Sequence, residues 1–277
     1  MSNKIEALFS QVQNVPQIPE VIRILINQLN NSDIDLKEIA RNVEKEQIIS
    51  AKVLRLVNSA SFGLPKKITS IEEAVILLGM GKLKILVIAS GIVSSVPKIE
   101  NFDITQFWLD SFSTATYARW LSNASGCEAD TAFTTGLLSG LGTILIHLGE
   151  TNKSIEIERL IKEEEYFRPF VEKTILGFCS QDVSAELCRF WKFSEDLITP
   201  VGQCGEPLLG NPISKIACCV FIARLISNCK ATEKTEEQTV ALIPAEMIEL
   251  LGFPETFFKE KMEDIMALES GLEGLLQ

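Results

Sequence analysis

Apolar residues recur at the spacing of an α-helix along almost the whole chain, and no other sequence feature constrains the fold as strongly. Residues 20–29 show the pattern, since the apolar positions that share one helix face there are Val21, Ile22, Leu25, Ile26 and Leu29. The valine- and isoleucine-rich run at 85–88 has the composition of a strand, but it lies inside a longer helical pattern. The sequence therefore predicts an all-α fold.

The same periodicity predicts the other helices and the breaks between them. One helix is expected to begin after Asp33 or Asp35, because an aspartate can accept from the free amides of a first turn. Another is expected to begin at a capping box, either Thr69 with Glu72 or Ser70 with Glu73, and to run to about residue 78. Further helices are expected at 47–58, 82–95, 106–125, 130–148, 153–165, 170–177, 182–191, 214–229, 244–251 and 254–268. A hinge is expected at 97–105, an irregular loop at 202–212 and a polar linker at 231–239. We therefore expect an N-terminal helical subdomain at 1–97, a helical core at 98–230 and closing helices at 231–277.

Composition narrows the class of protein. Hydrophobic residues make up 46% of the 277 residues, which is enough for a substantial core. The net charge is −11 and no basic patch is visible, which argues against binding to nucleic acid. The most apolar run, 85–96, is too short to cross a bilayer, and the first twenty residues lack the apolar core of a signal peptide. We expect a soluble, cytoplasmic protein with no nucleic-acid or membrane partner.

Residues that carry chemistry are few. The seven cysteines are odd in number and form no CxxC motif, which favours free, mostly buried thiols in a reducing compartment. His147 is the only histidine and lies in an apolar helix, so we expect a packed or half-exposed side chain, with an acid–base or pH-switch role as the alternative. Neither a phosphate-binding loop nor a GxSxG nucleophile motif is present. From the residues alone we expect a binding or scaffold protein with no catalytic residues, metal or cofactor.

Several short motifs resemble the HDOD (HD-related output domain) family. They are VPQIP at 15–19, AKVLRLVNSA at 51–60, FGLPKKITSI at 62–71 and AVILLG at 74–79. The resemblance covers about residues 12–230 and implies an N-terminal helical subdomain packed on a helical core related to HD phosphohydrolases, in a bacterial regulatory protein. The residues of these motifs to which we assign structural duties are Asn58, Ser59, Gly63, Pro65, Thr69 and Ser70. Glu46 and Gln47 stand where an Asp-Pro pair is usual in the family, which predicts a weaker helix cap.

The resemblance also places the positions at which HD hydrolases bind their catalytic metals. In this chain Asp110 stands at the first histidine position, Ser139 and Gly140 at the HD dipeptide, and Ser180 at a further histidine position. Cys204 and Gly205 occupy a paired-histidine segment, and Arg224 occupies the last carboxylate position. Serine and glycine are poor metal ligands and arginine is a fixed cation, so we expect no metal and only a vestigial pocket. One hypothesis is that Arg224 pairs with Asp110 in place of the lost metal.

Three functions follow from this resemblance. The first is a non-catalytic signal-transduction module that binds a protein partner such as a sensor kinase, a receiver or a cyclic-dinucleotide enzyme. Because the sequence holds no receiver, kinase or cyclase region, we expect the input to arrive in trans. The second is a sensor of a small, nucleotide-like molecule in the vacated metal cleft, unless larger side chains such as Phe112 or Phe178 fill it. The third is a residual metal-dependent phosphohydrolase.

Overall fold

The computed structural model describes residues 3–12, 14–27, 36–59, 62–64, 67–100, 102–164 and 167–276. Every regular element in these ranges is a helix, which confirms the predicted all-α fold. The chain divides into two compact units. We call residues 1–15 and 99–268 the core unit, and residues 16–98 and 269–277 the N-terminal unit.

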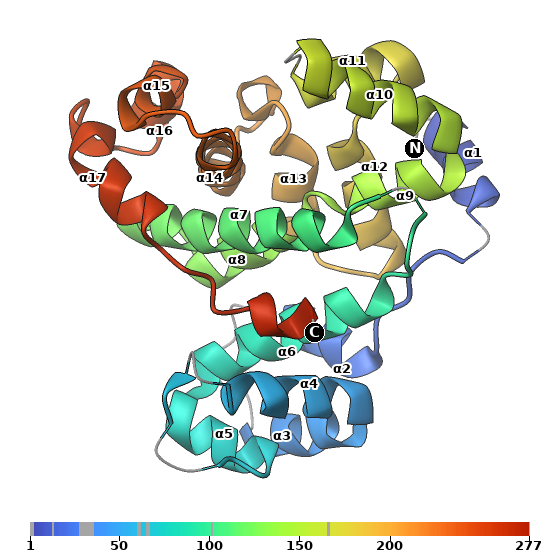
Figure 1. Cartoon of the computed structure of the whole chain (residues 1–277), viewed down its shortest axis with the longest axis vertical. Coiled ribbons are helices and arrows are strands. Elements are labelled where there is room, and N and C mark those ends of the chain that lie inside the picture. The colour runs from blue at the N-terminus through green and yellow to red at the C-terminus, as the bar shows by residue number, and fades with distance from the viewer. Residues whose placement is uncertain are drawn as a thin grey trace. The chain divides into compact units, whose positions relative to one another are not determined.

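The N-terminal unit is a small group of helices closed by a short C-terminal turn. Its elements are α2 (Glu20–Asn27), α3 (Leu36–Lys45), α4 (Gln47–Val57), α5 (Ile71–Leu78), α6 (Met80–Ser95) and the 3-10 helix η3 (Glu273–Leu276). Helix α6 contacts α2, α4, α5 and η3, so it forms the centre of this unit (Figure 1). Asp33 and Asp35, the expected caps of α3, lie outside the described residues.

Residues of the HDOD-like motifs form hydrogen bonds that stabilise this unit. Asn58 ends α4, and its side-chain amide donates to the carbonyl oxygens of Leu54 at 2.7 Å and Ile68 at 2.8 Å and accepts from the Ile68 amide at 2.7 Å. These bonds hold the loop between α4 and α5 against the end of α4. Gly63 in this loop has a φ of 55°, as expected of a turn glycine, whereas Pro65 lies outside the described residues.

The caps of α4 and α5 follow the sequence closely. Of the two expected caps of α5, the structure uses Ser70, whose hydroxyl accepts from the Glu73 amide at 3.1 Å. The Glu73 carboxylate accepts from the backbone amide of Thr69 at 2.9 Å, so both residues take part. Glu46 caps α4 without a side-chain hydrogen bond, which confirms the weak cap predicted there.

The core unit contains the remaining helices. They are α1 (Asn3–Gln11), α7 (Ile104–Ala124), α8 (Ala129–Leu138), α9 (Leu141–Gly149), α10 (Thr151–Glu164), α11 (Arg168–Leu176), α12 (Ser180–Phe190), α13 (Glu195–Gln203), η2 (Pro207–Leu209), α14 (Lys215–Ala231), α15 (Glu236–Ala241), α16 (Ala245–Leu250) and α17 (Phe257–Met266). The long helix α7 packs against α8 and α14 along its length, and α12 packs against α9 and α13 (Figure 1).

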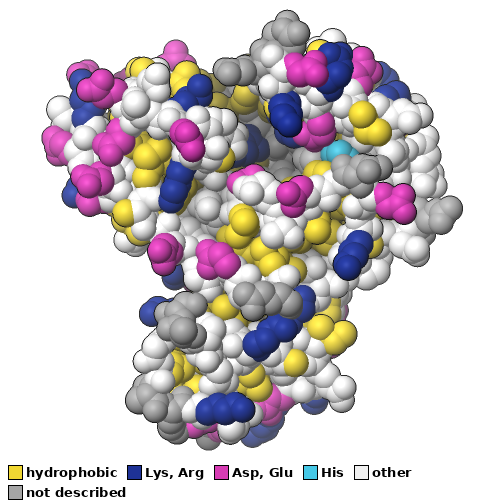
Figure 2. Space-filling view, in the orientation of Figure 1, with side chains coloured by type: hydrophobic (Ala, Val, Ile, Leu, Met, Phe, Trp, Pro, Cys, Tyr) yellow, Lys and Arg dark blue, Asp and Glu magenta, His cyan; other side chains and the backbone are white. Residues whose placement is uncertain are grey.

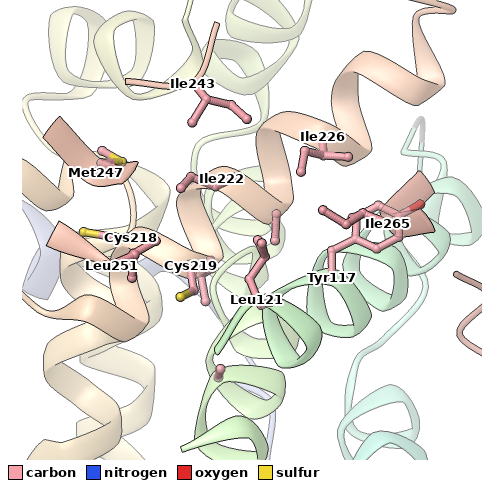
Figure 3. Packing of buried hydrophobic residues seen from close by; sticks show 14 of the residues in the cluster. Tyr117, Leu121, Cys218, Cys219, Ile222, Ile226, Ile243, Met247, Leu251 and Ile265 are labelled. Carbon is pink, nitrogen blue, oxygen red and sulfur yellow. The ribbon is translucent and has the colours of Figure 1, made fainter. Parts of the chain in front are cut away.

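One large apolar cluster fills the space between α7, α14 and the C-terminal helices. Figure 3 shows Tyr117 and Leu121 of α7 facing Ile222 and Ile226 of α14, with Ile265 of α17 beside them. The adjacent thiols of Cys218 and Cys219 are fully buried in the same cluster. Except for Cys127, which is half-buried, the cysteines are buried and free, as the sequence predicts.

The two units differ from the expected domains at both ends of the chain. Residues 1–15 belong to the core unit because α1 packs against α9, with Leu8 only 1% exposed. Residues 269–277 belong to the N-terminal unit because η3 packs on α4 and α6, with Leu275 buried. Residues 231–268 are part of the core unit rather than a separate closing group, since Phe258 lies in the main apolar cluster.

Three helices were not expected from the sequence. Helix α1 is short and polar, and α13 contains Pro200, which weakens a helical pattern. Helix α15 lies in the stretch that we expected to be a polar linker. It is stabilised by a capping box between Thr235 and Gln238, a signal that the polar composition of the stretch obscured.

The span from Ala129 to Gly149, which covers α8 and α9, is long and apolar enough to cross a membrane by length and composition. In the folded chain, however, 83% of its most apolar window is buried. This is the burial of core helices in a globular unit.

Candidate functional site

The sequence-predicted site residues other than Asp110 lie near the turn where α8 ends and α9 begins, and where α12, α13 and α14 approach that turn. Their hydrogen bonds define a group that we call the central cluster: Ser139, Gly142, Ser184, Cys204 and Arg224. All of these residues belong to the core unit.

Ser184 connects α12 to the α8–α9 turn. Its hydroxyl donates to the Ser139 carbonyl oxygen at 3.0 Å and accepts from the Gly142 amide at 2.8 Å. The Ser139 hydroxyl itself donates to the Gly136 carbonyl oxygen at 2.9 Å. Helices α9 and α12 approach so closely that a Cβ atom on Gly142 would lie 1.9 Å from the Ser180 carbonyl oxygen. Backbone therefore fills the space between these two helices.

Cys204 and Arg224 close the other side of the central cluster. Arg224 donates from Nη2 to the Cys204 carbonyl oxygen at 2.8 Å, and the Cys204 thiol donates to the Val201 carbonyl oxygen at 3.1 Å. Burial raises the pKa of the Cys204 thiol, although the charge of Arg224 and a hydrogen bond with Ser139 act to lower it. The thiol is consequently protonated at neutral pH.

Three other predicted residues border the central cluster but form no side-chain hydrogen bond with it: Gly140, Ser180 and Gly205. A Cβ atom on Gly205 would lie 2.9 Å from Oε1 of Gln181, and one on Gly140 would lie 3.1 Å from the Phe107 ring. The Ser180 amide donates to the buried Glu172 carboxylate at 2.6 Å. The Ser180 hydroxyl and Gln181 Oε1 are buried without a hydrogen-bond partner in the described part of the chain.

Asp110 stands apart from this group. It is half-buried on α7 and accepts a hydrogen bond from the side-chain amide of Gln106, Nε2, at 2.9 Å. Burial raises its pKa, the Gln106 bond lowers it, and the neighbouring charge of Asp103 raises it, with a net increase. Among the described ion pairs none joins Asp110 to Arg224, so the hypothesis of a cation replacing the metal there is wrong. Arg224 is held instead by the Cys204 carbonyl.

The donors present at this centre do not fit a divalent metal. An HD-type metal site needs imidazole and carboxylate ligands. The central cluster offers a serine hydroxyl bonded to backbone, a protonated thiol and a guanidinium. In the ranges that the structure describes, no three His, Cys, Asp or Glu side chains gather where they could hold a metal ion.

A second polar network begins at His147 and was not predicted from the sequence. His147 is 6% exposed, packs against the Phe102 ring at 4.4 Å between centroids, and lies 3.2 Å from a Glu158 oxygen through Nε2. Arg168 binds Glu158 in a bidentate pair at 2.7 and 2.9 Å and reaches Glu172 at 3.4 Å. Glu172 then accepts the Ser180 amide, so the network ends at the border of the central cluster.

The charges in this network determine the state of Glu158. Burial acts to raise its pKa, but hydrogen bonds and charge from His147 and Arg168 lower it to about 2. The expectation that His147 is a packed side chain is confirmed. Its partner was missed because Glu158 lies 11 residues away on another helix, and only the i,i+4 spacing of Arg168 and Glu172 hints at the network.

Comparisons with known proteins agree with this architecture. A crystal structure from Shewanella amazonensis, provisionally named a phosphohydrolase, superposes with a TM-score of 0.78 at 29% identity, covering 98% of this chain and 97% of that one. A crystal structure from Marinobacter aquaeolei, provisionally named a signal transduction protein, superposes with a TM-score of 0.82 at 15% identity, covering 99% of this chain and 65% of that one. The latter identity supports a shared fold alone.

Curated relatives extend beyond this chain. The cyclic di-GMP phosphodiesterase CdgJ of Vibrio cholerae is 26% identical over an alignment of 200 residues, and the match covers 62% of this chain and 45% of that protein. The chain spans less than half the length of the curated relatives it matches. The HDOD domain model matches residues 15–207, which include Asn58 and its partner Ile68, the α8–α9 turn and Cys204. The chain therefore belongs to the HDOD domain family.

Proposed function

We propose that this protein is a non-catalytic bacterial signal-transduction protein that acts by contact with a partner protein. The observation that carries the proposal is the central cluster, in which backbone and side-chain hydrogen bonds take the place of metal ligands. Ser184 joins the Ser139 carbonyl to the Gly142 amide, and Arg224 is bound to the Cys204 carbonyl. A hydrolase of the HD type would need metal-bound hydroxide at this position.

The names of the relatives are not evidence that this chain hydrolyses phosphate esters. The phosphodiesterase name belongs to CdgJ as a whole, and this chain matches 45% of it. Membership of the HDOD family, whose resemblance implies a bacterial regulatory protein, favours a regulatory role. We propose a cytoplasmic protein whose partner is a sensor kinase, a receiver or a cyclic-dinucleotide enzyme, with no nucleic acid or membrane partner.

Metal analysis tests the non-catalytic part of this proposal. The protein would be produced in cells supplied with iron, manganese, nickel and zinc and purified without chelators, and its metal content would be measured by mass spectrometry. We expect far less than one metal per chain, and no hydrolysis of bis-p-nitrophenyl phosphate or cyclic di-GMP when Mn²⁺ is added. Stoichiometric metal together with hydrolysis would overturn the proposal.

Affinity capture tests the partner. The tagged protein would be expressed in its native host and bound proteins identified by mass spectrometry, with the tag alone as the control. We expect one of the three named classes to be enriched, and binding to be reproduced with the purified pair. Failure of every enriched protein to bind in the purified system would count against a role in protein contact.

A further inference from the structure

Charge is distributed unevenly between the two units. Residues 51–98 of the N-terminal unit hold 7 Lys and Arg against 2 Asp and Glu, whereas residues 99–268 of the core unit hold 14 against 26. Figure 2 shows the same contrast on the visible face, where acidic side chains are frequent on the core unit and basic ones predominate on the N-terminal unit. The net charge of −11 therefore conceals a basic segment.

A pocket of about 540 Å³ lies within this basic segment. It is formed by α4 and by the loop that Asn58 clamps, and its lining residues are Leu54, Arg55, Asn58, Lys67, Ile68 and Thr69. Leu54 is half-buried and supplies apolar surface, Ile68 is buried at the base of the pocket, and Arg55 and Lys67 are exposed. The Asn58 bonds hold Ile68, one of the lining residues, against the end of α4.

The electrostatics of this pocket favour an anion. Lys52 lies one turn before Arg55 on α4, and burial together with the charge of Arg55 lowers the pKa of Lys52. In the described part of the chain, neither Lys52 nor Lys67 forms an ion pair. The carboxylate of Glu73 borders the pocket but is held by the Thr69 amide. An acidic group in the pocket would relieve the repulsion along α4.

The chain's own C-terminal segment packs on α4. Residues 269–277, ESGLEGLLQ, contain two glutamates and no basic residue. Leu272 and Leu275 of this segment are 1% exposed, and η3 packs on α4 and α6. Arg55 donates from Nη2 to the Gly274 carbonyl oxygen at 3.5 Å. A short leucine-anchored segment thus lies against α4, and it meets Arg55 through a backbone carbonyl oxygen.

We infer that the pocket lined by Leu54, Arg55, Lys67 and Ile68 is the docking site for an acidic, leucine-bearing segment of the partner protein. The inference rests on the proposed function, since it assigns a surface to the partner that the proposal requires. An apolar side chain would pack on the half-buried Leu54, and flanking carboxylates would meet Arg55 and Lys67. This arrangement combines an apolar anchor with charged flanks, as short-segment recognition commonly does.

Selection from a displayed library of random peptides tests the inference on the full chain. The variant Arg55→Glu/Lys67→Glu reverses the charge of the pocket. The control Lys82→Glu/Lys98→Glu makes the same charge change at two exposed residues of the same unit that do not line the pocket. All four positions are exposed, so equal unfolding curves for the three proteins would establish that each is folded.

We expect wild type and control to enrich peptides in which acidic residues flank a leucine. The pocket variant should bind the best of these peptides about tenfold more weakly or worse, because two favourable charge contacts become repulsive. The difference should shrink as salt is raised. Enrichment without acidic bias, equal binding by the pocket variant, or tighter binding to single-stranded DNA than to the peptides would overturn the inference.

The captured partner separates this inference from the proposed function. If the partner binds wild type and the pocket variant equally, the pocket assignment fails while the role in protein contact stands. If the pocket variant alone loses the partner, both stand. If no partner binds either protein, the proposed function fails whatever the peptides do.

Discussion

The contact between α9 and α12 yields the sharpest prediction, the effect of Gly142→Ala. The new Cβ would lie 1.9 Å from the Ser180 carbonyl oxygen, 2.8 Å from the Ser180 carbonyl carbon and 2.9 Å from Cβ of Val183. None of these atoms is the mobile end of a long side chain. The alanine therefore fits only if the two helices separate.

Two costs add to give the magnitude. Overpacking a well-packed core costs about 1–3 kcal/mol, and contact with backbone places this case at the upper end of that range. Separation of the helices also stretches the bonds from Ser184 to Ser139 and from Gly142 to Ser184, each worth about 1 kcal/mol. We expect Gly142→Ala to lower the free energy of unfolding by about 3–5 kcal/mol.

Urea unfolding followed by tryptophan fluorescence measures this loss. Trp108, Trp120 and Trp191 all lie in the core unit, so the signal reports the unit that carries the substitution. Gly202→Ala on α13 is the control, because its Cβ would meet only the Ala185 side chain at 3.3 Å. The helical preference of alanine offsets that contact, and we expect a change within about 1 kcal/mol. Equal effects of the two substitutions would refute the claim that backbone fills the centre.

Three further predictions concern other parts of the chain. Arg168→Gln should cost about 3 kcal/mol, because Glu172 is 1% exposed and would lose its cationic partner. The folded pKa of Glu158 is about 2, so its ionised carboxylate should stabilise the folded protein fully above its ordinary pKa. This stability should be lost as the pH falls towards 2, and the loss should be smaller in Arg168→Gln. Asn58→Ala should cost about 2–3 kcal/mol through three lost hydrogen bonds, measured by urea unfolding followed by circular dichroism because the tryptophans lie in the other unit. A thiol-alkylating reagent should label Cys127 alone in the native protein, as mass spectrometry would show, and the other cysteines only after unfolding.

Features that depend on neighbours in sequence were predictable. The Ser70 cap and the end of α4 at Asn58 involve residues at most ten positions apart, and their residue types encode the bonds they make. Most helices were predicted for the same reason, since an apolar stripe fixes both the helix and its buried face. The weak cap at Glu46 followed from the loss of a side chain suited to capping.

Features that depend on contacts between distant segments were not predictable. The pairing of His147 with Glu158 requires α9 and α10 to pack in one particular register. The family resemblance assigned Ser139, Cys204 and Arg224 to one centre, and they lie together in the structure, but the resemblance could not assign the hydrogen bonds of Arg224. It also could not exclude a pair with Asp110, because side-chain direction on a helix changes by 100° per residue.

The hydrogen bonds of the central cluster also bear on whether the former metal centre could have become a ligand site. A ligand that enters between Ser139 and Cys204 must displace up to four hydrogen bonds, those of Ser184 to Ser139, Gly142 to Ser184, Arg224 to the Cys204 carbonyl and the Cys204 thiol to Val201. At about 1 kcal/mol each, this lowers affinity by about a thousandfold unless the ligand replaces every bond. A partner segment that docks on the pocket beside α4 breaks none of them. Binding at the surface of the N-terminal unit is therefore less costly than binding at the old centre.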